Sequence, residues 1–115
     1  PAAVGAYSQA IVANGFVYCS GQVPLDPQSG ELIGGSIADQ TRRCLENLSA
    51  VLRAAGAGLD DVVKVTAFLV DMNDFPEFNE AYGEFFGDEP PARATVAVAG
   101  LPKGAEVEVE CVATV

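Results

Sequence analysis

The sequence predicts an α+β fold in which a mixed β-sheet carries two helices on one face. Two segments place apolar residues at helical spacing, and segments rich in β-branched residues lie before, between and after them. The expected order along the chain is therefore β-β-α-β-α-β-β, with an optional short strand around Leu32 before the first helix. At 115 residues the chain is long enough for one domain, which is expected to span residues 1–115.

Residues 10–20 are expected to form a β-hairpin. Apolar residues flank Asn14 and Gly15, and an Asn-Gly pair is well suited to a tight type I′ turn. Ser20 and Gly21, at the end of this hairpin, have two interpretations. Either they form a β-bulge, because glycine inside a strand often marks one, or they belong to a binding site.

The first helix is expected to begin at Ser36, which can cap it together with Asp39, and to end at Gly56. Its arginines lie off the apolar face and are expected to be solvated, with Arg42 paired to Glu46 four residues later. The residues expected to face the core are Ile37, Cys44, Leu45, Leu48, Val51, Leu52 and Ala55.

Residues 62–70 are expected to form a strand that is covered on both faces, because apolar side chains occupy both. Asp74 and Glu77 predict the start of a second helix, which Gly87 is expected to end. An aromatic face on this helix is typical of a packed core rather than of a cofactor site. It consists of Phe75, Phe78, Tyr82, Phe85 and Phe86.

The last two strands, residues 92–99 and 106–114, contain the residues of greatest chemical interest. Glu106, Glu108 and Glu110 alternate with apolar residues, so all three are expected to project from one face of the sheet. If the two strands pair as a hairpin, Glu108 and Glu110 lie opposite Arg93 and form a plausible binding pocket. A solvent-facing strand, or a structural ion pair between Arg93 and one of these glutamates, is the alternative.

Composition excludes several classes of partner. The chain has 16 acidic and 6 basic residues and a net charge of −10, whereas binding to nucleic acid or anionic membranes needs a basic face. No apolar run approaches the ~18 residues of a membrane span. No basic leader with an apolar core opens the sequence, so a cytoplasmic location is expected.

The cysteines and the absence of histidine limit the possible chemistry. Cys19, Cys44 and Cys111 lack metal-ligand spacing and are expected to be buried thiols in a reducing compartment. The chain has no histidine, which excludes Ser-His-Asp and Cys-His catalysis. General base catalysis, if any, therefore falls to carboxylates.

Four motifs occur in an order and spacing that resemble the RidA/YjgF/UK114 family of enamine/imine deaminases over essentially the whole chain. They are Tyr7-Ser8-Gln9-Ala10, Ser20-Gly21-Gln22, Pro91-Ala92-Arg93, and Leu101-Pro102-Lys103 followed by the Glu-x-Glu strand. The resemblance implies a chorismate-mutase-like (YjgF-like) fold and homotrimers with sites in the clefts between subunits. It also implies a hydrolase acting on C=N bonds, which converts 2-iminobutanoate or 2-iminopropanoate to the 2-oxo acid and ammonia without a metal or organic cofactor.

The same resemblance assigns site residues. Arg93 matches the arginine that binds the substrate carboxylate, and Glu108 matches the catalytic glutamate that positions and activates water. Substrate contacts are implied for Tyr7, Ser20, Gly21, Asn79 and Thr95. Two departures from the family pattern are Ala6, where proline is usual, and Thr95, where many members have cysteine. Threonine leaves deamination possible but removes any thiol chemistry at that position.

Two further functions stay open at this point. One is a non-enzymatic module that binds small ligands or proteins on the same trimeric scaffold. The other is a ribonuclease or translation inhibitor, an activity also attributed to relatives. The acidic composition and the absence of histidine count against RNA cleavage, which normally needs cationic anchoring and a proton shuttle.

Overall fold

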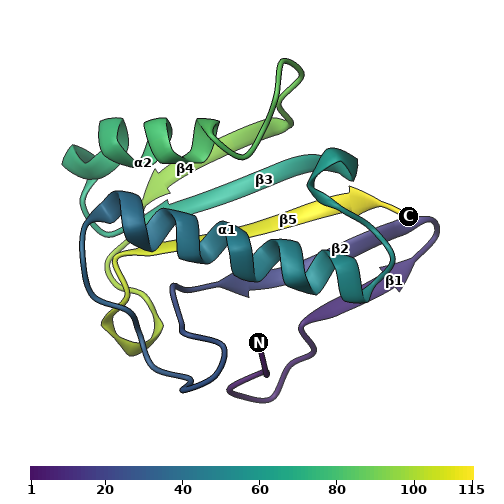
Figure 1. Ribbon diagram of the computed structural model, residues 1–115, viewed down its shortest axis with the longest axis horizontal. Coiled ribbons are helices and arrows are strands. Elements are labelled where there is room, and N and C mark those ends of the chain that lie inside the picture. The colour runs from purple at the N-terminus through teal and green to yellow at the C-terminus, as the bar shows by residue number, and fades with distance from the viewer.

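A computed structural model, which describes residues 1–115, has two helices over a five-stranded mixed sheet (Figure 1). The strand order across the sheet is β1-β2-β5-β3-β4, and only the pair β3–β4 is parallel. The strands are β1 (Ala10–Ala13), β2 (Phe16–Gln22), β3 (Val62–Leu69), β4 (Ala92–Ala97) and β5 (Val107–Thr114). The helices are α1 (Ile37–Ala54) and α2 (Phe75–Gly83). This architecture confirms the predicted α+β fold.

The predicted hairpin is present as β1 and β2. Asn14 and Gly15 have φ values of 52° and 80°, the left-handed conformation that a type I′ turn requires at both positions. The short strand expected around Leu32 is reduced to an isolated bridge between Leu25 and Leu32.

A β-bulge interrupts the pairing of β2 with β5, as one interpretation of Ser20 and Gly21 predicted. Cys19 pairs with Cys111, and the ladder resumes where Gln22 pairs with Val109. One extra residue on β2 must therefore be accommodated between these two pairs.

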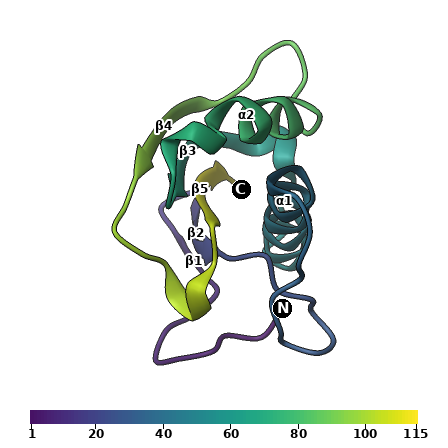
Figure 2. The ribbon, with the colours of Figure 1, turned by 90° about the vertical axis from the view of Figure 1, so that its left-hand side faces the viewer.

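The hydrophobic core lies between α1, α2 and one face of the sheet (Figure 2). Ser36 caps α1, because its hydroxyl oxygen accepts a hydrogen bond from the backbone N–H of Asp39, and the left-handed Gly56 follows the helix. The predicted apolar face of α1 is buried, except that Ala55 is half-buried. The same face also buries three polar residues that the apolar pattern did not indicate, Gln40, Thr41 and Asn47.

The predicted surface ion pair between Arg42 and Glu46 does not form. The guanidinium of Arg42 instead binds Glu84, beyond the end of α2, at 3.0 Å, and Asp39 at 3.2 Å. Glu46 pairs with Arg43 at 3.7 Å. The packing of α1 against α2 brings Glu84 within reach of Arg42, which spacing within one helix could not reveal.

The second helix begins where predicted, at Phe75 directly after Asp74, but the predicted capping bond and the predicted C-terminal end are wrong. Asp74 makes no side-chain capping bond, and α2 ends at Gly83 rather than at Gly87. Asp71 caps a preceding 3₁₀ turn instead. The carboxylate of Glu77 accepts a hydrogen bond from the backbone N–H of Ala38, so it satisfies the N-terminus of α1 rather than that of its own helix.

The expected hairpin of the last two strands does not form. The central strand β3 lies between β4 and β5, pairing Val65 with both Arg93 and Cys111. A strand–helix–strand connection through α2 makes β4 parallel to β3, the usual outcome of such a crossover. The chain must then pass β3 to reach the antiparallel β5.

One face of the sheet carries no helix (Figure 2). Within one chain β3 is thus covered on one face only, contrary to the sequence-based expectation. Neither helix is long and apolar enough to cross a membrane. We call this helix-free face the uncovered face. Its residues include Ile11, Tyr18, Lys64, Thr66, Phe68, Ala94, Val96, Glu108, Glu110 and Val112.

Asn47 should contribute measurably to stability. Its side-chain N–H groups donate to the carbonyls of Leu25 at 2.8 Å and Val23 at 3.4 Å, which tie the loop after β2 to α1. Asn47→Ala leaves the carbonyl of Leu25 without its hydrogen-bond donor, whereas the carbonyl of Val23 still accepts from the backbone N–H of Leu25. The substitution should lower the free energy of unfolding by about 1–3 kcal/mol in chemical denaturation. The exposed Asn73, whose side chain makes no hydrogen bond, is the control, and Asn73→Ala should cost less than about 0.5 kcal/mol. Equal losses would contradict this role of Asn47.

Candidate functional site

Four of the predicted site residues lie around one cavity of about 470 Å³, next to strands β2 and β5. Tyr7, Ser20, Gly21 and Glu108 line this cavity, hereafter the Glu108 cavity. Tyr7 comes from the segment before β1, Ser20 and Gly21 from the β2 bulge, and Glu108 from β5. The structure therefore brings together residues that lie 101 positions apart in sequence at their extremes, Tyr7 and Glu108.

The bulge allows the chain to approach the Glu108 carboxylate closely. A Cβ atom placed on Gly21 would collide with the carboxylate group of Glu108, so only glycine leaves that side chain in its present position. The hydroxyl of Ser20 donates to the carbonyl of Ser8 at 2.6 Å. Its hydrogen is thus committed, and its oxygen can only accept a hydrogen bond from a ligand.

Glu108 has the electrostatic character of a functional carboxylate. It is half-buried, and neither it nor its neighbour Glu110 has a hydrogen-bond or ion-pair partner. Burial raises the pKa of the Glu108 carboxyl, and the negative charge of Glu110 raises it further. A half-buried carboxylate in a cavity with a raised pKa is a candidate general base or acid.

Arg93 forms the other half of the site, on β4 beneath α2. Its guanidinium carbon lies 4.6 Å from the ring centroid of Tyr82, 5.5 Å from that of Phe75 and 5.8 Å from that of Phe78. Cation–π contacts of this kind fix the guanidinium but leave its N–H groups unpaired. With Asn79, Arg93 lines a second hollow of about 470 Å³ at the edge of the sheet.

The structural ion pair that the sequence left open for Arg93 does not form. The three salt bridges of the chain all involve Arg42 or Arg43. Although 16 acidic residues surround a handful of cations, no carboxylate neutralises Arg93. The guanidinium is thus rigidly held and available to an external anion.

The two halves do not meet within one chain. Arg93 contacts α2 and so lies on the helix-covered face, whereas Glu108 lies on the uncovered face. The expectation that pairing would set them opposite each other is wrong because β3 separates their strands. Glu106 also departs from expectation. It precedes β5, and its carboxylate accepts a hydrogen bond from Gln40 of α1 at 3.1 Å, so it does not share the surroundings of Glu108.

Thr95 lies two residues beyond Arg93 on β4 and is not among the residues that line the Arg93 hollow. Its hydroxyl oxygen is buried and has no hydrogen-bond partner. Buried polar atoms are usually satisfied, so this hydroxyl is suited to bind a ligand or a water molecule.

Sequence analysis missed several residues of the site. Gln9, Gln22 and Glu110 line the Glu108 cavity, and the rings of α2 support Arg93 besides filling the core. Gln9 and Gln22 each belong to one of the recognised motifs, which was the available signal. The support of Arg93 by aromatic rings depends on tertiary packing and leaves no local signature.

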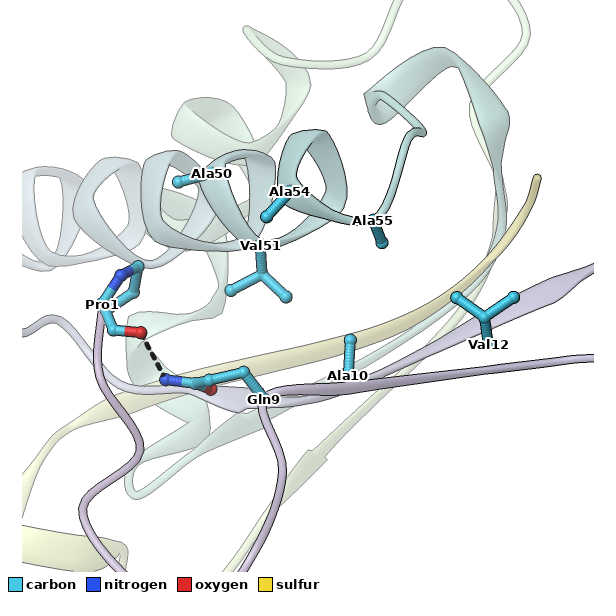
Figure 3. A pocket seen from close by; sticks show the side chains of 8 residues that line it. All are labelled: Pro1, Gln9, Ala10, Val12, Ala50, Val51, Ala54 and Ala55. Carbon is cyan, nitrogen blue, oxygen red and sulfur yellow. Dashed lines mark hydrogen bonds between the residues drawn. The ribbon is translucent and has the colours of Figure 1, made fainter.

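A further cavity, of about 440 Å³, lies between β1 and the C-terminal half of α1 (Figure 3). Its walls are mainly small apolar side chains, among them Ala10, Ala50 and Ala54. No charged side chain lines it.

Comparison with known proteins identifies the relatives of this chain. The family model described as endoribonuclease L-PSP matches residues 1–115. The 2-iminobutanoate/2-iminopropanoate deaminase of Rattus norvegicus is 47% identical over 113 residues, which cover 98% of this chain and 82% of that protein. The structure of RidA from Psychrobacter sp. PAMC 21119 is 44% identical with a TM-score of 0.96, covering 100% of this chain and 93% of that one. The structure of E. coli TdcF with bound serine is 41% identical with a TM-score of 0.94, covering 100% and 92%. On fold, motifs and identity together, the chain belongs to the RidA/YjgF/UK114 family.

Proposed function

We propose that the protein is a 2-imino acid deaminase, which hydrolyses 2-iminobutanoate or 2-iminopropanoate to the 2-oxo acid and ammonia. The observation that carries this proposal is Arg93, a rigidly held arginine without a carboxylate partner in a chain of net charge −10. Relatives of high identity bear the name of this activity, and one binds serine, a small amino acid.

The role of Arg93 is to bind the substrate carboxylate. A guanidinium can form two parallel hydrogen bonds to a carboxylate, which fixes the plane of a small substrate as well as its position. Because aromatic rings already hold the guanidinium, little side-chain entropy is lost on binding. Asn79 lines the same hollow and provides an amide for a further hydrogen bond.

The role of Glu108 is to move protons during hydrolysis. As the ionised carboxylate, it accepts a proton from water while the water oxygen adds to the imine carbon and the C=N bond becomes C–N. Glu108 then returns this proton to the nitrogen, which gives a carbinolamine. In a second transfer Glu108 takes the proton of the carbinolamine hydroxyl and passes it to the amine, so that the C–N bond breaks, ammonia leaves and the carbonyl of the 2-oxo acid forms. Tyr7, Ser20 and Gly21 line the same cavity and confine the substrate beside the carboxylate.

This mechanism needs a second copy of the chain, because Arg93 and Glu108 lie on opposite faces of the sheet. We propose a homotrimer in which the Arg93 hollow of one subunit closes the Glu108 cavity of the next. The uncovered face, with the exposed apolar residues Ile11, Tyr18 and Val96, supplies a surface for such contacts. A ring of three subunits then contains three identical sites.

The name endoribonuclease L-PSP keeps an RNA-cleaving function as the second candidate. Salt-sensitive binding of single-stranded RNA is the property that would favour it, since binding through phosphates displaces counterions. The charge of −10 and the absence of histidine favour the deaminase instead. A non-enzymatic binding module is the third candidate, and it would bind 2-oxo acids without turnover.

The activity can be tested by generating 2-aminoacrylate in situ with a serine or threonine dehydratase. The protein should accelerate the release of 2-oxo acid and ammonia from this precursor. Tight binding of 2-oxo acids without acceleration would favour the binding module. RNA degradation by a preparation free of contaminating nuclease would favour the ribonuclease.

Substitution of the two central residues should separate binding from chemistry. Arg93→Ala should lower kcat/KM by at least about a hundredfold, because two charge-assisted hydrogen bonds to the substrate carboxylate are lost. Arg93→Lys keeps the charge but loses the planar fork, so most activity should still disappear. Glu108→Gln should lower kcat by about 10²–10⁴-fold and bind 2-oxo acids almost normally.

Glu106→Gln is the matched control for Glu108→Gln, because Glu106 is engaged with Gln40 and does not line the cavity. It should retain nearly full activity, and Glu110→Gln should retain more activity than Glu108→Gln. Loss of activity in Glu106→Gln with survival of Glu108→Gln would show that the acid–base residue has been misassigned.

Mixing two inactive variants tests whether the site is shared between subunits. Wild type should have the mass of three 11.9 kDa chains by light scattering. When Arg93→Ala and Glu108→Gln are refolded together in equal amounts, about a quarter of the sites should combine an intact Arg93 with an intact Glu108 from a neighbour. Activity should return to about that fraction of wild type. A monomeric protein, or a mixture that stays inactive, would argue against a shared site.

Gly21→Ala should strongly reduce activity while preserving the fold. The added methyl group must displace the Glu108 carboxylate, which is the end of a flexible side chain and can move without unfolding the strand. We expect kcat to fall by at least about tenfold with little change in melting temperature. Gly34→Ala is the control, since a Cβ at Gly34 meets no atom within 4 Å. Retention of full activity by Gly21→Ala would contradict the proposed position of the carboxylate.

The pH dependence should reflect the environment of Glu108. The reaction needs the ionised carboxylate, so kcat/KM falls as pH drops through the pKa of Glu108, which burial and then Glu110 raise. The acid limb should therefore lie above the ordinary glutamate pKa of about 4.3. Glu110→Gln removes the like charge and should move this limb to lower pH, although burial keeps it above the ordinary value. An upward movement, or none, would be inconsistent with this assignment.

A further inference from the structure

The N-terminal segment, residues 1–9, forms one wall of the Glu108 cavity although it contains no helix or strand. A segment of this kind is ordered only by the contacts that hold it. It carries Tyr7, whose side chain is 44% exposed and lines the cavity. The residues that hold the segment therefore decide where Tyr7 stands relative to Glu108.

Every hydrogen bond between this segment and the rest of the chain goes to one of two β2 residues, Ser20 and Gln22. The backbone N–H of Ser20 donates to the carbonyl of Gln9 at 2.8 Å, and the Ser20 hydroxyl donates to the carbonyl of Ser8 at 2.6 Å. The side-chain amide of Gln22 donates to the side-chain oxygen of Gln9 at 2.8 Å. The remaining hydrogen bonds of the segment join its own residues.

Gln22 and Gln9 form a continuous chain of amides that reaches the start of the segment. The side-chain amide of Gln9 in turn donates a hydrogen bond to the carbonyl of Pro1 at 2.9 Å (Figure 3). Gln22 is only 5% exposed and lies directly after the bulge, paired with Val109 between the two cavity glutamates of β5. A buried amide at this point connects the segment to the strand pair that carries Glu108.

We propose that Gln22 is a positioning residue, which acts through Gln9 to fix residues 1–9, and with them Tyr7, beside the Glu108 carboxylate. This inference rests on the deaminase function proposed above, because positioning matters only if the Glu108 cavity binds substrate. Gln22 acts without touching the reacting atoms: it donates to Gln9 and, at 3.3 Å, to the carbonyl of Ser20. Loss of the Gln22 amide releases residues 1–9, which form one wall of the cavity. This weakens substrate binding more than it slows the chemical step.

Gln40 provides a matched comparison. It is also 5% exposed, and its side-chain amide donates to the carbonyl of Gly35 and to the carboxylate of Glu106, both at 3.1 Å. These bonds join the start of α1 to the start of β5 and do not involve residues 1–9. Gln40 and Gln22 should therefore contribute similarly to stability but differently to binding.

The test replaces each glutamine by methionine, which has similar length and no hydrogen-bond donor. Gln22→Met should raise the KM for the imino acid about five- to tenfold, the effect expected from one hydrogen bond, while kcat changes less than about twofold. Hydrogen exchange of the backbone amides in residues 2–9 should become faster. Gln9→Met should behave in the same way, and the double variant should add little to either single variant. Gln40→Met should lose stability with KM and exchange at residues 2–9 unchanged.

The outcomes distinguish failure of this inference from failure of the proposed function. If wild type deaminates but Gln22→Met and Gln9→Met keep the wild-type KM, or keep residues 2–9 protected, the positioning role is overturned and the function stands. If wild type does not deaminate, the function is overturned, and the dissociation constant of 2-oxobutanoate replaces KM in the same comparison. If Gln22→Met fails to fold, Gln9→Met decides alone, because Gln9 is only half-buried and its loss should be tolerated.

Discussion

The position of β3 between β4 and β5 is the constraint on which the rest of the structure depends. It places Arg93 on the face covered by α2 and Glu108 on the uncovered face, so one chain holds two incomplete halves of a site. A sheet with a bare face that includes exposed apolar side chains is a surface suited to self-association. In the proposed trimer, assembly and catalysis would be linked, because the contact that covers the apolar face would also complete the site.

The availability of Arg93 follows from the way in which its neighbours are arranged. Arg42 and Arg43 lie on α1, where acidic residues at three-residue spacing, or just beyond the end of α2, bind them. Arg93 meets aromatic rings instead, and a ring face attracts the cation without occupying its N–H groups. The aromatic face of α2 thus has two roles, since the rings that fill the core also orient the guanidinium. The anion site proposed for this acidic protein therefore needs no added positive charge elsewhere.

Local patterns were sufficient to predict the elements and insufficient to predict their arrangement, and the candidate site residues were assigned mainly by resemblance to a family. The Asn14-Gly15 turn, the Ser36 cap and the bulge at Ser20 and Gly21 depend on residues close in sequence. The turn and the cap were predicted correctly, and the bulge was one of two interpretations left open. The pairing of β4 with β3 depends on the crossover through α2, and the sequence pattern could not distinguish it from a hairpin. Glu77 illustrates the same limit, because its capping partner belongs to another helix. The roles of Arg93 and Glu108 came from resemblance to a family, while their separation within one chain came from the fold.

Some of the unsatisfied polar groups of this chain lie in or beside the two halves of the proposed site, while two others, the Nε of Arg43 and the side-chain oxygen of Asn47, lie on α1 and line neither half. Glu108 and Glu110 stand side by side without a cation, and the hydroxyl of Thr95 is buried without a partner. Each of these costs stability, because burial disfavours an unpaired charge and a buried hydroxyl loses its water. An apolar residue at any of the three positions would remove that cost. Groups that destabilise the free chain are retained most readily where a ligand or a neighbouring subunit satisfies them. The free Arg93 fits the same argument, so the two halves of the site are complementary in charge as well as in position.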